Sequence, residues 1–217
     1  MNTKMIKMAL AGVVLSVSGF ANASFISTTI TSNNSLTIPA SGTSGVASSF
    51  PTLLDVSGVL GTIVDVNVFL TGVSHTFPDD INIGIVGPTD VAVYLWADAG
   101  GGGDIQNLDI TFDDAALSAM ANGGQILSGS YQVSQFGWDN PNIPASFGSI
   151  LADFNGLSAN GLWSLYVLDN TGGDVGSMQG WGLEIITEVT DVPEPSTLAI
   201  LGLGLMGLAS RRFKKQP

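Results

Sequence analysis

Apolar and polar residues alternate in several short segments of the chain. In residues 64–70 the sequence Val-Asp-Val-Asn-Val-Phe-Leu places an apolar residue at every second position. A period of two is the pattern of a β-strand with one buried and one exposed face. Turn-forming residues separate such segments, as in Gly87-Pro88-Thr89-Asp90. The pattern therefore predicts an all-β fold, either a sandwich or a barrel. The same alternation occurs in residues 81–85, 91–95, 163–167 and 181–185.

Two longer apolar runs lie near the ends of the chain. The first, residues 8–17, follows Lys4 and Lys7 and precedes Ala21-Asn22-Ala23. A positive start, an apolar stretch and a small-residue cleavage site are the three parts of a secretory signal peptide. An ordinary buried helix would explain the apolar stretch but neither the charges nor the cleavage site. Residues 1–23 are therefore predicted to be a signal peptide, with Ser24 as the first mature residue.

The second apolar run, residues 197–209, follows Pro193-Glu194-Pro195 and precedes a basic cluster at residues 211–215. It is short for a bilayer span, which needs about 20 residues, but the basic cluster predicts a cytoplasmic C-terminus. These three parts resemble the PEP-CTERM sorting signal of Gram-negative bacteria, over residues 193–217. The resemblance implies processing by an exosortase, and hence an inner-membrane intermediate followed by a cell-surface or extracellular location. A simple C-terminal membrane anchor is the alternative.

All six Lys and Arg residues belong to these two ends. Between Ser24 and Pro193 there is no Lys or Arg, whereas every Asp and Glu of the chain except Glu194 lies there. Such a domain must tolerate its self-repulsion or bind cations. Nucleic acid is excluded as a partner, because the carboxylates would repel phosphates. The chain has no Cys, so an exported domain of this composition relies on core packing or bound ions instead of disulfides.

Many of the Asp residues fall in Gly-rich or polar loops. Ca²⁺ takes several oxygen ligands from carboxylates and loop carbonyls, and Gly allows backbone oxygens to turn toward the ion. Softer metals are disfavoured, because the chain has no Cys and His75 is its only His. The alternative is that each Asp simply caps a turn. For the whole set we expect at least one Ca²⁺ site.

The sequence offers little for catalysis. A Ser-His-Asp triad would have to use His75, whose surroundings lack the pattern of a nucleophile elbow, so we expect its ring to hydrogen-bond a neighbouring turn. Paired carboxylates could serve glycoside hydrolysis, but nearly all are Asp residues in turns and not in apolar pockets. We therefore expect no enzyme. Trp163 and Trp181 are expected in the core, and Trp138 is the candidate for stacking on a sugar.

A series of short motifs follows in order along residues 36–187. They are Val64-Asp65-Val66-Asn67-Val68, Ser74-His75-Thr76-Phe77-Pro78-Asp79-Asp80-Ile81, Ile85-Val86-Gly87-Pro88-Thr89, Thr111-Phe112-Asp113-Asp114-Ala115, and, most specifically, Asn160-Gly161-Leu162-Trp163-Ser164-Leu165 with Trp181-Gly182-Leu183-Glu184-Ile185. They resemble the P-domain that follows the catalytic domain in kexin- and furin-like proprotein convertases and in many bacterial secreted proteases. The resemblance implies a single-domain β-sandwich of jelly-roll type, similar to galactose-binding domains.

The resemblance also implies where Ca²⁺ would bind, because the family carries this ion in its acidic loops. Two departures from the family pattern matter. Asp79 stands where the family has a Gly, which adds a carboxylate to that loop. No subtilisin-like protease domain precedes the module, so we do not expect it to stabilise an attached protease. The residues that match the family's Asp positions are Asp80, Asp104, Asp113, Asp169 and Asp174.

These observations divide the chain into five parts and predict a function. We expect a non-catalytic, secreted binding or structural module with Ca²⁺-stabilised acidic loops, sorted by an exosortase. The alternative is a protease-associated domain that acts in trans with a subtilisin-like serine endopeptidase. Expected partners are signal peptidase and exosortase during processing, then envelope polysaccharide or a secreted protease. The parts are a signal peptide (1–23), an N-terminal extension (24–35), the P-domain-like sandwich (36–187), a linker (188–192) and the sorting signal (193–217).

Overall fold

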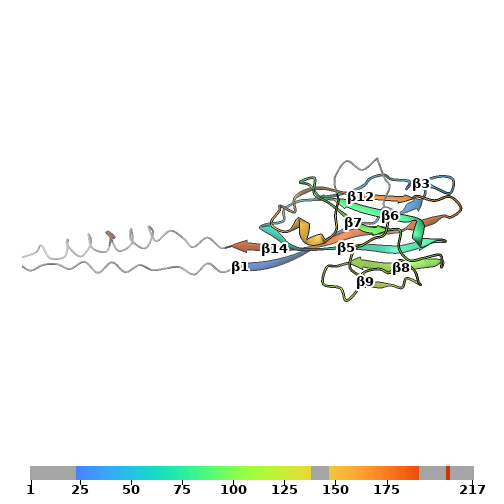
Figure 1. Ribbon diagram of the computed structural model, residues 1–217. Coiled ribbons are helices and arrows are strands. Elements are labelled where there is room, and N and C mark those ends of the chain that lie inside the picture. The colour runs from blue at the N-terminus through green and yellow to red at the C-terminus, as the bar shows by residue number, and fades with distance from the viewer. Residues whose placement is uncertain (1–22, 138–146, 191–203, 206–217) are drawn as a thin grey trace, which may run out of the picture. The chain divides into compact units, whose positions relative to one another are not determined.

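The computed structural model describes residues 23–137, 147–190 and 204–205. Residues Ala23–Val189 form one compact unit, and residues 1–22 together with 190–217 form another. Apart from Ala23, the predicted signal peptide lies outside the described residues, as do Trp138 and nearly all of the sorting signal. No helix within the described ranges is long and apolar enough to cross a membrane. The rest of this section concerns the compact unit (Figure 1).

Two seven-stranded sheets make up this unit. In the first sheet, two pairs of strands lie on the same side of β5. In one pair β1 is the edge strand and pairs with β14, and in the other β2 is the edge strand and pairs with β13. Next come β5, which pairs with both β13 and β14, then β8, and finally β9 in parallel with β8. The strands of this sheet are β1 (Ala23–Ser32), β2 (Leu36–Ile38), β5 (Thr62–His75), β8 (Ile105–Phe112), β9 (Gly129–Tyr131), β13 (Gly176–Met178) and β14 (Gly180–Thr190).

The second sheet has a similar plan. β3 and β4 both pair with the same edge of β12. The other edge of β12 pairs with β6, and β6 pairs with β7. Two short strands, β10 and β11, add to the outer edge of β7 in parallel. The elements are β3 (Gly45–Val46), β4 (Thr52–Val56), β6 (Ile81–Val86), β7 (Ala92–Ala97), β10 (Ser134–Gln135), β11 (Phe147–Gly148) and β12 (Gly161–Asp169), with the 3₁₀ helices η1 (Pro78–Asp80) and η2 (Leu151–Phe154) in the connections.

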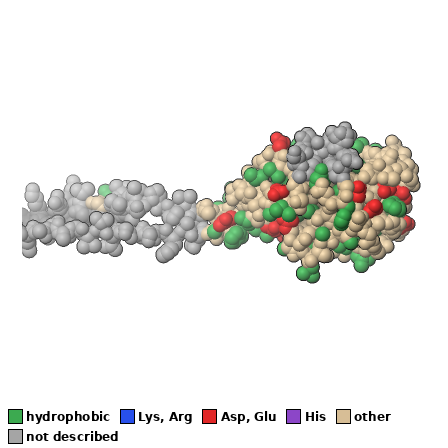
Figure 2. Space-filling model, in the orientation of Figure 1, with side chains coloured by type: hydrophobic (Ala, Val, Ile, Leu, Met, Phe, Trp, Pro, Cys, Tyr) green, Lys and Arg blue, Asp and Glu red, His purple; other side chains and the backbone are tan. Residues whose placement is uncertain are grey.

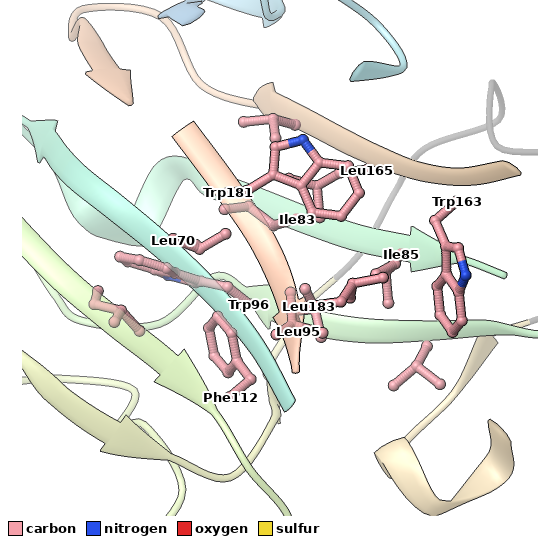
Figure 3. Close-up of a cluster of buried hydrophobic side chains, with 14 of the residues drawn as sticks. Leu70, Ile83, Ile85, Leu95, Trp96, Phe112, Trp163, Leu165, Trp181 and Leu183 are labelled. Carbon is pink, nitrogen blue, oxygen red and sulfur yellow. The ribbon is translucent and has the colours of Figure 1, made fainter. Parts of the chain in front are cut away.

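The core lies between the two sheets, where the apolar residues of the alternating segments meet (Figure 3). Trp96, Trp163 and Trp181 are among the largest fully buried side chains. Their indole N–H groups donate to Ala99 O at 2.9 Å, Ala159 O at 2.9 Å and Thr52 Oγ1 at 3.3 Å. Burying an apolar side chain of this kind contributes about 1.5–3 kcal/mol, provided that its polar atom finds a partner. Trp163 and Trp181 are therefore core residues, as predicted.

The register of β5 defines two ends of the sandwich. At one end Thr62 pairs with Glu188 of β14, and at the other His75 pairs with Gly176 of β13. A strand of 14 residues spans about 45 Å at roughly 3.3 Å per residue. Since β14 finishes at the Thr62 side, we call this side the terminal end. The side of His75 and η1 is the acidic end, where Figure 2 shows carboxylate side chains at the right of the molecule.

The predicted fold class is confirmed: the unit is an all-β sandwich forming a single domain. Strand β1 occupies most of the predicted N-terminal extension, and β14 continues to Thr190, into the segment predicted as a linker. The division of the chain into five parts otherwise stays a prediction.

Candidate functional site

The five Asp residues predicted as Ca²⁺ ligands do not form one group. Asp80 in η1, Asp169 at the end of β12 and Asp174 in the following turn lie near one another, since Asp169 and Asp174 both act electrostatically on Asp80. Asp104 is exposed and precedes β8, and it is not among the carboxylates that act on Asp80. Asp113 follows the other end of β8, where it acts on Asp65 instead.

Asp80 is the most perturbed carboxylate at the acidic end. Its residue surface is only 7% exposed. Burial, followed by the negative charges of Asp169, Asp174, Asp79 and Asp98, raises its pKa to about 6. No hydrogen bond to its carboxylate is found within the described residues, although its backbone carbonyl accepts from Asn170 N at 3.0 Å. A nearly buried carboxylate without a partner is costly when charged, so this position favours a proton or a cation.

His75 is held between the two sheets. Its Nε2 lies 3.2 Å from Asp169 Oδ2, and both side chains are fully buried. Its Nδ1 contacts the backbone of Phe77, 2.9 Å from the carbonyl oxygen and 3.1 Å from the nitrogen. Asp169 Oδ1 accepts the Thr171 N–H at 3.0 Å. Burial raises the pKa of Asp169, while the Thr171 N–H and His75 act in the opposite direction.

These contacts decide what His75 can do. The expected contact of its ring with a neighbouring turn is present, in the form of the Phe77 backbone. Within the part of the chain that the structure describes, no hydroxyl group hydrogen-bonds to His75, and its other nitrogen faces Asp169. A triad requires the imidazole to contact both a nucleophile and a carboxylate. In the described residues, His75 contacts a carboxylate, Asp169, but no nucleophile.

Two other carboxylates of the acidic end, Asp98 and Asp174, accept internal hydrogen bonds. Asp98 Oδ1 accepts from the amide groups of Asn82 at 2.7 Å and Asn170 at 2.8 Å, which links the ends of β6, β7 and β12. Asp174 Oδ1 accepts the Thr76 hydroxyl at 2.8 Å. These bonds satisfy charged oxygens without any basic residue. The turn-capping alternative does not describe these two residues, because their partners lie 16 to 98 residues away in the chain.

A second group of carboxylates surrounds Asp65 on the first sheet. Burial, then the charges of Asp113, Asp114 and Glu184, raises the pKa of Asp65. Asp113 Oδ1 accepts the N–H of Ala115 two residues later at 2.7 Å, which is an Asx turn. The Asp113 carboxylate therefore stabilises the turn that it begins.

Asp114 has a different structural role. Its two oxygens accept the N–H groups of Leu151 at 3.0 Å and Ala152 at 2.7 Å, at the start of η2. Asp114 also lines a cavity of about 210 Å³ with Gln132, Val133, Ser149 and Ile150. The cavity holds no free acid–base pair among its lining residues, because Asp114 is occupied by the backbone of η2.

Residues 79–82 offer oxygen donors for a hard cation. The described residues contain no group of three or more His, Cys, Asp or Glu side chains placed to hold a metal ion. However, Asp79 Oδ1 and Asn82 Oδ1 are buried without a hydrogen-bond partner, and they flank Asp80 in the chain. Carboxylate, amide and backbone oxygens are the donors that Ca²⁺ prefers. Residues 79–82 therefore fit such an ion better than Asp104 or Asp113 does, and Asp169, whose Oδ2 also lacks a hydrogen-bond partner, lies near Asp80.

Comparisons with known proteins concern mainly the C-terminus. The PEP-CTERM protein-sorting motif matches residues 191–215. The chain thus carries a PEP-CTERM sorting motif. This confirms the predicted signal, which implies export in a Gram-negative bacterium and processing by an exosortase. No curated protein matches the chain.

Two solved structures are similar to the chain at a low level. One is the complex of the Aeromonas sobria serine protease with its chaperone, with a TM-score of 0.40 and 12% identity over 79% of this chain and 28% of that chain. The other is the serine protease of Aeromonas sobria, with a TM-score of 0.40 and 13% identity over 76% of this chain and 27% of that chain. The chain spans less than a third of the length of either, and likeness at this level carries no argument about function.

Proposed function

We propose that this protein is a non-catalytic β-sandwich module that is delivered to the cell surface through its PEP-CTERM motif and acts there as a binding or structural component. The observation that carries the proposal is the position of the motif. It begins at residue 191, directly after β14 ends at Thr190, so the signal follows a complete folded unit. The module is thus the cargo that the exosortase sorts.

The side-chain contacts support a non-catalytic role. The single His is buried against Asp169, and Asp98, Asp113, Asp114 and Asp174 accept internal hydrogen bonds. Catalysis by general acid and base needs groups that can reach a substrate. In the described residues these five side chains are engaged in contacts within the protein.

Ca²⁺ is the cofactor that we propose for the acidic end. Asp80 would hold the ion, with Asp79 and Asn82 as the neighbouring oxygen donors, and the ion would supply the positive charge that the domain lacks. An ion that binds only the folded state stabilises it by RT ln(1 + [L]/Kd), about 2.7 kcal/mol at a hundredfold excess over Kd. Support comes from the partnerless carboxylate of Asp80 and the unpaired oxygens beside it.

Localisation and activity together test the proposed function. In cells that contain the exosortase, the protein should reach the outer surface, where an added protease can cut it. In cells that lack the exosortase, it should stay in the inner membrane. The pure mature protein should show no hydrolysis of peptide or glycoside panels. A protein that stays in the inner membrane despite an active exosortase would contradict surface delivery, and turnover by the pure protein would contradict the non-catalytic role.

A trans role with a subtilisin-like serine endopeptidase is the second candidate. It is favoured by the P-domain motifs in residues 36–187 and is compatible with the β-sandwich fold. In this case the module would raise the refolding yield or the thermal stability of a co-secreted protease when the two are mixed. An unchanged yield and melting temperature of the protease would argue against this candidate.

A further inference from the structure

Three large apolar side chains are exposed at the terminal end of the sandwich. Phe25 and Ile26 on β1 are 66% and 40% exposed, and Leu60 in the turn between β4 and β5 is 66% exposed. The chains of β1 and β14 run in opposite directions, since Gly182 of β14 approaches Ile30 and Gly180 approaches Ser32. The start of β1 therefore lies beside the last residues of β14.

Leu60 belongs to the same end. The next residue, Gly61, packs directly against the backbone of Glu188 near the end of β14. The turn is fixed by Asn160, whose Oδ1 accepts the Val59 N–H at 2.9 Å and whose Nδ2 donates to Val59 O at 2.6 Å. Phe25, Ile26 and Leu60 thus lie around the end of β14, with Phe25 and Ile26 on opposite faces of β1, and we call these three residues the apolar rim.

The loops of the two ends differ in charge, although Asp55 on β4 and Glu188 on β14 also lie near the apolar rim. The two loops beside the apolar rim, residues 57–61 and 155–160, contain no charged residue. The loops of the acidic end carry Asp79, Asp80 and Asp174. A surface that combines exposed apolar side chains with uncharged loops suits contact with a lipid interface, whereas a carboxylate-rich surface is repelled by phosphate groups.

Chain length places the terminal end near the membrane. Only residues 191–196 separate Thr190, the last residue of β14, from Thr197, where the apolar run of the sorting signal begins. Seven chain steps reach at most about 25 Å. The acidic end lies about 45 Å further along β5. While the apolar run is held in the membrane, the terminal end can touch the bilayer.

We propose that the apolar rim contacts the lipid bilayer until the exosortase cleaves the precursor. In this orientation the terminal end faces the membrane and the acidic end is directed away from it. The partner is the bilayer surface itself. The proposal rests on the proposed function, because it requires a precursor that is held in the membrane by the sorting signal.

Spin labels test this contact, and the absence of native Cys makes single labels specific. The chain from Ser24 to Pro217 is reconstituted in phosphatidylcholine vesicles with Ser57→Cys, beside the apolar rim, or Ser177→Cys on β13 near the acidic end. Both serines are exposed. At position 57 the label should lose accessibility to a water-soluble nickel chelate and gain accessibility to oxygen. The label at position 177 should remain accessible to the chelate.

The outcomes separate this proposal from the proposed function. Failure of the unlabelled chain to float with the vesicles would contradict both the membrane-held precursor and the contact. Flotation with equal chelate accessibility at the two positions would contradict the contact alone.

A triple substitution asks whether the apolar rim makes the contact. Phe25→Ser with Ile26→Ser and Leu60→Ser should restore chelate access at position 57 while the chain still floats. Val46→Ser with Phe77→Ser and Val175→Ser changes three exposed apolar residues near the acidic end and should leave the label protected. Continued protection of the label in the rim variant would overturn the proposal.

Discussion

His75 Nε2 lies 3.2 Å from Asp169 Oδ2, and this contact joins β5 of one sheet to β12 of the other. Both side chains are fully buried, and neither of these two atoms makes an aligned hydrogen bond. In a domain without Lys or Arg, His75 is the only side chain that can place positive charge beside a buried carboxylate.

Removing His75 should destabilise the fold strongly. His75→Ala leaves the Asp169 carboxylate buried without its partner, and breaking a buried pair in this way costs about 3–5 kcal/mol. Adding Asp169→Asn should recover part of that loss, because the uncompensated charge is removed. Urea unfolding of the two single variants and the double variant measures the coupling. Strictly additive losses would show that the two groups do not interact.

Asp80 should make the fold less stable as the pH rises. Its pKa in the folded protein is about 6, against 3.8 for the ordinary group, so the folded state binds the proton more tightly. The stabilising effect of that proton is complete below pH 4 and is lost as the pH rises through 6. At about 1.4 kcal/mol per pKa unit, the effect amounts to at most about 3 kcal/mol.

The measurement is urea unfolding at pH 5 and pH 7 in the presence of a chelator. Wild type should be more stable at pH 5, and Asp80→Asn should be more stable than wild type at pH 7 with a smaller dependence on pH. The opposite pH dependence in wild type would show that Asp80 is not the dominant group.

Calcium should stabilise the protein through residues 79–82. The melting temperature should rise by several degrees in millimolar Ca²⁺ and fall in chelator, beyond the effect of NaCl at equal ionic strength, because bound ion adds about 2.7 kcal/mol at a hundredfold excess over Kd. Asp80→Asn should remove this difference, whereas the matched variants Asp104→Asn and Asp113→Asn should retain it. Equal shifts in Ca²⁺ and NaCl would mean that the acidic residues only cap turns.

Much of the fold could be predicted from alternation, since β5, β6, β12 and β14 each present a regular apolar face to the core. Strand β1 could not be predicted in this way. Its sequence is mostly Ser and Thr, and most of its side chains are exposed, so no apolar stripe marks it. It is a strand because the edge of β14 offers hydrogen-bond partners to its backbone. The local sequence of residues 23–32 does not reveal this pairing.

The site was predicted less completely, because its residues meet through long-range pairing. Asp98 and Asn170 are 72 residues apart in the chain. They form a hydrogen bond because β7, β6 and β12, whose ends carry them, are neighbours in the sheet. Motif matching selected Asp80, Asp113 and others by their positions in the sequence, but it contained no information on which of them share a loop region. The unpaired oxygens of Asp79 and Asn82 likewise become evident only from burial.

Intact-mass measurement of the envelope protein tests the central claim most directly. If the PEP-CTERM motif delivers the folded unit, the protein from exosortase-containing cells should lack residues 1–23 and the tail beyond Pro195. In exosortase-deficient cells the tail should remain, with only the signal peptide removed. The β-sandwich, which ends at Thr190, should be intact in both. A mass that still includes Arg211 to Lys215 in exosortase-containing cells would contradict sorting through this motif.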